Sequence, residues 1–219
     1  MKTYDGTNDA PVRSAEFSIC RPGHGASCAL CCGSHNFNCT REDLLGLMEH
    51  RASRLSLFSP EYLLGKVRQS RSNLTGSIYF SPVNFFLDEP PPLDESSPRC
   101  PFLAIDETGT TGCALNREAH RHGGTVDCVL SYRGKRFMCP AGERLSTREI
   151  RFAAQFAGDW YFYSILIHNN ALLSRMLREW GDPGAISAVD REPIEEELER
   201  YRVSCLDIHR IDNYYGVPR

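Results

Sequence analysis

Ten cysteines constrain the fold of this 219-residue chain more than any other feature of its sequence. They are spaced Cys20-x7-Cys28-x2-Cys31-Cys32-x6-Cys39, then Cys100-x12-Cys113-x14-Cys128-x10-Cys139, with a distant Cys205. A C-x2-C pair places two thiolates on one tight turn, close enough to bind the same metal ion. The spacing therefore predicts that metal fixes the irregular segments in which these cysteines lie.

The adjacent pair Cys31-Cys32 is the most informative part of the pattern. Neighbouring side chains point in different directions, so one thiol can bind one centre while the other reaches a second centre or the opposite face. Adjacent cysteines also make a strained disulfide, which argues against a disulfide framework. Two sets of four cysteines could serve two four-coordinate sites, or one cluster and one zinc site. The predicted ligands are Cys20, Cys28, Cys31, Cys32, Cys100, Cys113, Cys128 and Cys139.

The expected compartment also favours metal over disulfides. The first residues, MKTYDGTNDAP, are polar and lack the apolar region of a signal peptide. The most apolar stretch, residues 160–167, is shorter than the roughly 20 residues that cross a bilayer. We therefore expect a cytoplasmic protein with no membrane contact, and thiols are kept reduced in that compartment.

Charge and composition narrow the classes of partner. The chain has 25 basic and 28 acidic residues, a net charge of -3. This balance gives no electrostatic reason to expect binding to nucleic acid or to an anionic membrane. The hydrophobic share of 41% is enough for a real core. The composition leaves a protein partner or a protein substrate as the kind of partner to expect.

The apolar spacing predicts a mainly α fold with small irregular or β parts, an α-helical scaffold carrying two Cys-rich loop segments stapled by metal. Thr40, with Asp43 three residues later, predicts a helix start before an apolar stripe at residues 44–48. Ser59-Pro60 predicts a second short helix. Residues 73–80 are expected to form a strand, and residues 82–101 an extended proline-rich loop.

The last part of the sequence predicts helices. Ser146 and Glu149 form a capping box, and Asp159 is expected to begin a longer helix that ends at Gly181. Pro193 is expected to begin the last helix, with acidic residues in its first turn. We divide the chain into a Cys-rich metal-binding domain with two short helices, 1–145, and a helical C-terminal extension packed on it, 146–219.

Further candidate ligands lie near the cysteines. They are His24, His35, His120 and His122, although a single histidine is more often a solvated side chain. Cys205 is interpreted as a small buried apolar residue of the last helix. Cys39 lies just before a helix start, and the sequence does not decide whether it binds metal.

Several short motifs resemble a known family. Cys28-Ala-Leu-Cys31-Cys32-Gly33, followed by a Thr-Arg-Glu-Asp-Leu helix start, resembles the opening of the YkgJ-type family, whose members are described as zinc- or iron-chelating proteins. The later Cys100-Pro-Phe-Leu, Gly112-Cys113-Ala-Leu, Cys128 and Cys139-Pro are similar to that family's later motifs. The resemblance extends over residues 17–142. The spacing from Cys20 to Cys28 is similar to the start of flagellin lysine-N-methylases, which belong to the same wider group.

Three functions remain open at this point. Soft thiolates bind zinc or iron–sulfur clusters, and many thiolates at irregular spacing favour an iron–sulfur cluster in a redox or supporting role. By analogy with the lysine methylases, the chain could methylate a protein lysine, although it has no Gly-rich turn suited to a methyl donor. In the third hypothesis, zinc is structural and Trp160-Tyr161-Phe162-Tyr163 is a protein-binding surface, with at least half of these four residues in the core.

Overall fold

The computed structural model describes residues 18–57, 62, 89–95, 97, 99–100, 102–114 and 139–207. Within these residues the chain forms six α-helices, one short β-hairpin and two 3-10 turns. The mainly α fold predicted from the sequence is therefore confirmed. The expected helix at Ser59-Pro60 and the expected strand at 73–80 lie outside the described residues.

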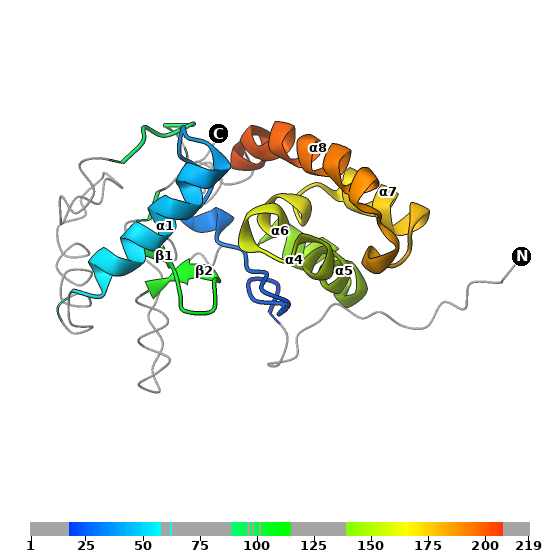
Figure 1. Ribbon diagram of the computed structural model, residues 1–219, viewed down its shortest axis with the longest axis horizontal. Helices are drawn as coiled ribbons and strands as arrows, with labels where there is room; N and C mark the ends of the chain where they lie inside the picture. The colour runs from blue at the N-terminus through cyan, green and yellow to red at the C-terminus, as the bar shows by residue number, and fades with distance from the viewer. Residues whose placement is uncertain are drawn as a thin grey trace, which may run out of the picture.

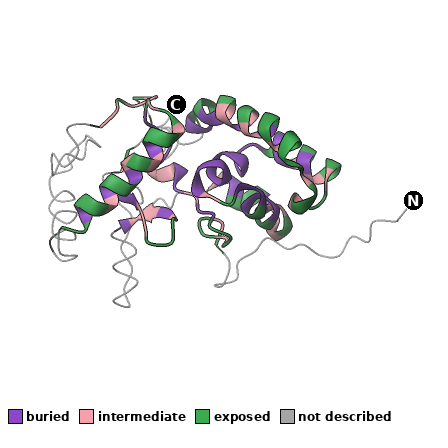
Figure 2. Cartoon of the chain, in the orientation of Figure 1, coloured by how far each residue is buried: buried purple, intermediate pink, exposed green. Residues whose placement is uncertain are grey.

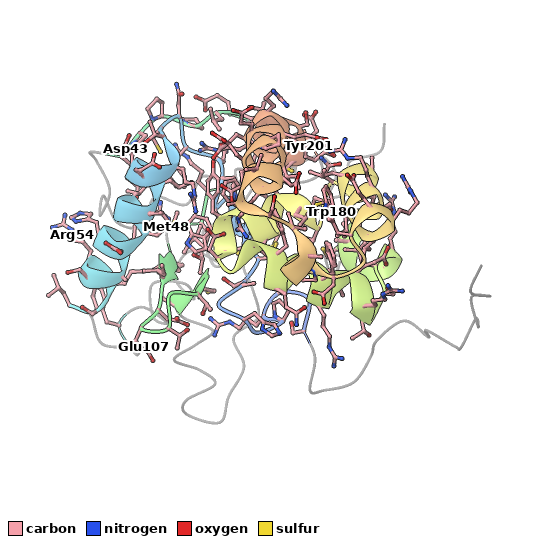
Figure 3. All side chains as sticks on the ribbon, turned by 45° about the vertical axis from the view of Figure 1, so that its right-hand side comes forward. Asp43, Met48, Arg54, Glu107, Trp180 and Tyr201 are labelled. Carbon is pink, nitrogen blue, oxygen red and sulfur yellow. The ribbon has the colours of Figure 1, made fainter. Side chains whose placement is uncertain are left out.

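Helix α1, Arg41–Leu55, begins as the sequence predicts. The Thr40 hydroxyl accepts a hydrogen bond from the backbone N–H of Asp43 at 3.1 Å, which satisfies one of the free donors at the helix start. Leu44 and Met48 are fully buried. Figure 3 shows Met48 on the side of α1 that faces the rest of the molecule, with Arg54 at its outer edge.

A two-stranded antiparallel hairpin packs against α1, and the sequence analysis did not predict it. Strand β1, Leu103–Ile105, pairs with β2, Thr111–Cys113, so that Leu103 lies opposite Cys113. The turn between them is held by Asp106, whose carboxylate accepts hydrogen bonds from the backbone N–H groups of Thr108 and Thr110. Strands of three residues are too short to produce a recognisable alternation of apolar and polar residues.

The capping box at Ser146 is confirmed. Helix α5, Thr147–Ala157, follows the short helix α4, Pro140–Arg144. Ser146 and Glu149 exchange side-chain-to-backbone hydrogen bonds at the start of α5, and Gly158 ends the helix in the left-handed conformation.

The predicted single helix from Asp159 to Gly181 is wrong, although Asp159 does cap its start. The chain forms α6, Trp160–Leu166, and α7, Asn170–Glu179. The break occurs because the Asn169 side chain accepts a hydrogen bond from the N–H of Leu172 at 3.1 Å and so begins a new helix. All four aromatic residues at 160–163 are buried. The proposed protein-binding surface at these residues is therefore wrong as well.

Helix α8, Ala188–Asp207, follows the 3-10 turn η3, Pro183–Ala185. It begins five residues before Pro193, where the sequence analysis placed its start, so that prediction is wrong. The Ser187 hydroxyl accepts a hydrogen bond from the N–H of Asp190 at 3.2 Å, a capping contact that starts the helix earlier. Pro193 is tolerated in the second turn.

Helix α6 forms the centre of the molecule, with α5, α7 and α8 packed around it (Figure 1). Every residue of α6 is buried, as the purple ribbon in Figure 2 shows. A single cluster of buried residues joins the loop at 26–37, α1 and the C-terminal helices. The division of the chain at residue 145 stays a prediction. No helix among the described residues is both long enough and apolar enough to cross a membrane.

Candidate metal centre

The loop before α1 brings its cysteines together through tight backbone turns. Gly23, His24 and Gly25 have φ values of 94°, 56° and 74°, so three successive residues adopt the left-handed region. This turn reverses the direction of the chain, so that the N–H of Cys28 donates to the carbonyl of Cys20 at 3.0 Å. The 3-10 turn η1, Leu30–Cys32, then carries the adjacent pair of cysteines.

Four thiols interact at one side of this loop, and we call them the first cysteine group: Cys20, Cys28, Cys31 and Cys139. Partial desolvation of the Cys20 thiol raises its pKa to about 12, and the neighbouring thiols of Cys31 and Cys139 add to this shift. Burial also raises the pKa of Cys28, with further contributions from Cys20 and Cys31. Cys139 begins α4, so the group joins two segments that are far apart in sequence.

A second cysteine group consists of Cys32, Cys100 and Cys113. The N–H of Cys100 donates to the carbonyl of Cys32 at 2.8 Å. Cys113 enters the group because β2 pairs with β1, whose Leu103 donates its N–H to the carbonyl of Cys100 at 3.2 Å. The thiols of Cys100 and Cys113 help to raise the pKa of Cys32, after a hydrogen bond with Cys31 and burial. The predicted ligand Cys128 lies outside the described residues.

The two groups adjoin at Cys31 and Cys32. A hydrogen bond between these two thiols lowers the pKa of Cys31 and raises that of Cys32. Adjacent residues of one 3-10 turn thus belong to different cysteine groups. Two metal centres built on these groups would be neighbours.

Helix α6 supports the first group from the C-terminal part of the chain. The Tyr163 hydroxyl donates to the carbonyl of Ile19 at 2.7 Å, and the Ser164 hydroxyl donates to the carbonyl of Ser27 at 3.3 Å. Burial, followed by the thiols of Cys28, Cys20 and Cys139, raises the pKa of Tyr163. These contacts fix the loop on both sides of Cys20.

His168 was not identified from the sequence, yet it lies beside the first group. Its Nε2 is 3.8 Å from Sγ of Cys139, and burial lowers the pKa of its imidazole. No spacing pattern links His168 to the cysteines, because the contact depends on where α6 ends.

Of the four histidines suggested by the sequence, the two that the structure describes do not join either group. His35 is fully buried, with its ring nitrogens 2.8 Å from the Ser34 hydroxyl and 3.0 Å from the carbonyl of Tyr161. Burial and the charge of Arg202 lower its pKa to about 3, so the ring is neutral. His24 is exposed, and His120 and His122 lie outside the described residues.

The two remaining described cysteines stand apart from both groups. Cys205 is fully buried in α8, as predicted, with Sγ 3.9 Å from the carbonyl of Ile165. Burial raises the pKa of Cys39, and its charged neighbours are Arg202 and Asp43 rather than other thiols. Cys39 therefore provides a matched reference cysteine for both groups.

An acidic groove runs between the start of α1 and α8. Its lining carries five carboxylates and two guanidinium groups, those of Arg41 and Arg202, and the Arg41 guanidinium lies 4.5 Å from the ring centre of Phe162. The acidic residues are Glu42, Glu192, Glu195, Glu196 and Glu199. A groove of this charge favours cationic over anionic groups.

No three His, Cys, Asp or Glu side chains among the described residues are arranged so as to hold one metal ion as they stand. Comparison of the chain with known protein families, with curated proteins and with solved structures finds no match. The function is therefore inferred from the residues of the two cysteine groups.

Proposed function

We propose that this chain is a metalloprotein with two adjoining centres, one at each cysteine group. The observation that carries the proposal is that seven thiols from separate segments gather into two groups that meet at Cys31 and Cys32. The first centre would draw its thiolate ligands from the first cysteine group, Cys20, Cys28, Cys31 and Cys139. The second would use Cys32, Cys100 and Cys113, with Cys128 as the fourth ligand expected from the sequence.

The donor set fits an iron–sulfur cluster, with zinc as the alternative metal. Thiolates are soft ligands that suit both, and clusters accept irregular ligand spacing. Within the described residues, the buried Thr111 hydroxyl has no hydrogen-bond partner. It lies on the same face of β2 as Cys113, because alternate residues of a strand share a face. A sulfur atom of a bound centre would offer this hydroxyl an acceptor. The resemblance to zinc- or iron-chelating proteins also supports the proposal.

The role we propose is redox chemistry or the support of a protein-modification reaction. An iron–sulfur cluster would supply reversible one-electron chemistry when bound. The residues of this chain would hold the cluster and limit the access of water to it through Tyr163 and the loop that Tyr163 contacts. The alternative of lysine methylation gains one supporting feature in the acidic groove, whose carboxylates suit a lysine side chain.

The test is anaerobic purification of the full chain, followed by analysis of iron, zinc and labile sulfide and a visible spectrum. We expect the paired substitutions Cys28→Ser with Cys139→Ser to remove one centre and Cys32→Ser with Cys100→Ser to remove the other. Cys39→Ser is the matched control and should keep the full metal content. A wild-type chain without iron or zinc would sink the proposal, as would an equal loss of metal in the control.

The same samples separate the two roles. A cluster that is reduced and reoxidised reversibly supports the redox role. Methyl transfer to lysine in a basic peptide, abolished by charge reversal in the acidic groove, would instead support the methylation role.

A further inference from the structure

His168 reaches the first cysteine group from the C-terminal helices. It follows α6, where its own N–H donates to the carbonyl of Ile165 at 3.1 Å and closes the turn. Only 7% of the residue is exposed. Its Nε2 faces the thiol of Cys139 at 3.8 Å.

The hydrogen bond at the other ring nitrogen shows where the proton of a neutral His168 ring lies. Nδ1 is 2.8 Å from the carbonyl oxygen of Ser164. A carbonyl oxygen can only accept, so Nδ1 carries the hydrogen. The neutral ring then has its lone pair on Nε2, directed at Cys139 in the first group.

Metal-binding histidines in proteins show this same arrangement. The nitrogen that does not bind the metal donates its N–H to a carboxylate or a backbone carbonyl, which fixes both the tautomer and the ring orientation. We propose that His168 is a ligand of the first centre through Nε2, an inference that rests on the metal-binding function proposed above. The C-terminal helices would then contribute directly to metal binding.

His168 brings the number of donors in the first group to five. A zinc ion or a common iron–sulfur cluster takes four protein ligands, so one donor is surplus. Cys20 is the only one of the five that is exposed, and we expect it to be the surplus donor. The first centre would have three sulfur ligands and one nitrogen ligand, whereas the second would have sulfur ligands only.

A nitrogen ligand would make the two centres chemically different. Neutral imidazole in place of thiolate removes one negative charge from the centre. In iron–sulfur proteins with histidine ligands, this change raises the reduction potential. The first centre would therefore accept an electron more readily than an all-thiolate centre of the same type.

The test loads the full chain with cadmium-113 as the metal alone, in protein whose histidines carry nitrogen-15. We expect a separate cadmium resonance for each centre, because their ligands differ. One resonance should be split by coupling to a histidine nitrogen. This splitting should vanish in His168→Ala and persist in His50→Ala, which changes an exposed histidine of α1.

Two further variants distinguish the loss of a ligand from a folding defect. His168→Cys should restore cadmium binding at the first centre but without nitrogen coupling. Cys20→Ser should keep both the metal and the coupling. Cadmium bound without any nitrogen coupling would overturn the His168 ligand while leaving the two metal centres intact. A chain that binds no cadmium at all would overturn both proposals. If Cys20→Ser lost the first centre and His168→Ala kept it, Cys20 would be a ligand and His168 would not.

Discussion

Gly25 of the cysteine-bearing loop lies directly against Gly158, the residue that ends α5. A Cβ atom at Gly25 would lie 2.8 Å from the carbonyl oxygen of Gly158, and φ at Gly25 is +74°. Gly23, two residues earlier, has φ of +94°, but no atom of the described residues lies within 4 Å of such a Cβ. Substituting alanine at each glycine in turn therefore separates the free-energy cost of the backbone conformation from that of the contact with Gly158.

We expect Gly23→Ala to lower the free energy of unfolding by about 1 kcal/mol, the cost of an alanine at positive φ. Gly25→Ala should cost at least about 1 kcal/mol more, because the loop must also move away from Gly158. Urea unfolding of both variants measures the difference. Equal losses would mean that the loop yields to the methyl group without cost.

At the same scale, the sequence identified the cysteines but not their grouping. The spacing separates residues 20–39 from residues 100–139, whereas in the structure Cys139 joins the first group and Cys32 joins the second. The turn η1 and the hairpin decide this arrangement, and neither has a sequence signature of useful length. The assignment of specific thiols to each group therefore needed the structure.

Among the elements, three helix starts were predicted correctly, whereas the break between α6 and α7 and the start of α8 were not. Thr40, Ser146 and Asp159 all cap helices as their side chains predict. The break at Asn169 was missed because the apolar pattern runs on through α6 and α7. The early start of α8 was missed because Pro193 is a stronger sequence signal than the Ser187 cap.

Helix α8 holds the loop that follows the first group through one side chain. The guanidinium of Arg202 donates to the carbonyl oxygens of His35, Phe37 and Cys39 at distances of 2.6–3.3 Å. The residue is only 7% exposed, so these carbonyls have little access to water. A planar group with five donors can satisfy three acceptors at once.

Arg202→Lys should lower the free energy of unfolding by about 2–3 kcal/mol, because a single ammonium cannot reach all three carbonyls. The control is Arg175→Lys, which changes a half-exposed partner of Glu197 and should cost no more than about 0.5 kcal/mol. Both values come from denaturant unfolding. A similar small loss in the two variants would show that the loop does not depend on α8.

For the whole molecule, the raised pKa values of thiols in the first cysteine group predict opposite pH dependence with and without metal. In the metal-free chain, Cys20 titrates near 12 rather than at its ordinary 9.0, and the pKa values of Cys28 and Cys139 are also raised. The folded chain then holds more protons than the unfolded chain above pH 9. Its stability must fall as the pH rises through that range.

With metal bound, the thiolates are already deprotonated in the folded chain, whereas the unfolded chain keeps its protons below about pH 9. Stability should therefore rise with pH up to that point. Thermal unfolding of the loaded and metal-free chain between about pH 6 and pH 10 tests both slopes. A metal-free chain whose melting temperature stays constant above pH 8 would contradict the prediction, and Cys28→Ser should weaken the slope.

Because Cys139 completes a group that begins at Cys20, the order of synthesis matters to the cell that makes this protein. A ribosome adds roughly 5–20 residues per second, so the first thiols emerge on the order of ten seconds before the last of their group. Helix α6 and Arg202 arrive later still. Under the proposed function, metal could complete the first centre only after these parts of the chain have been synthesised, and the nascent chain would carry exposed thiols until then.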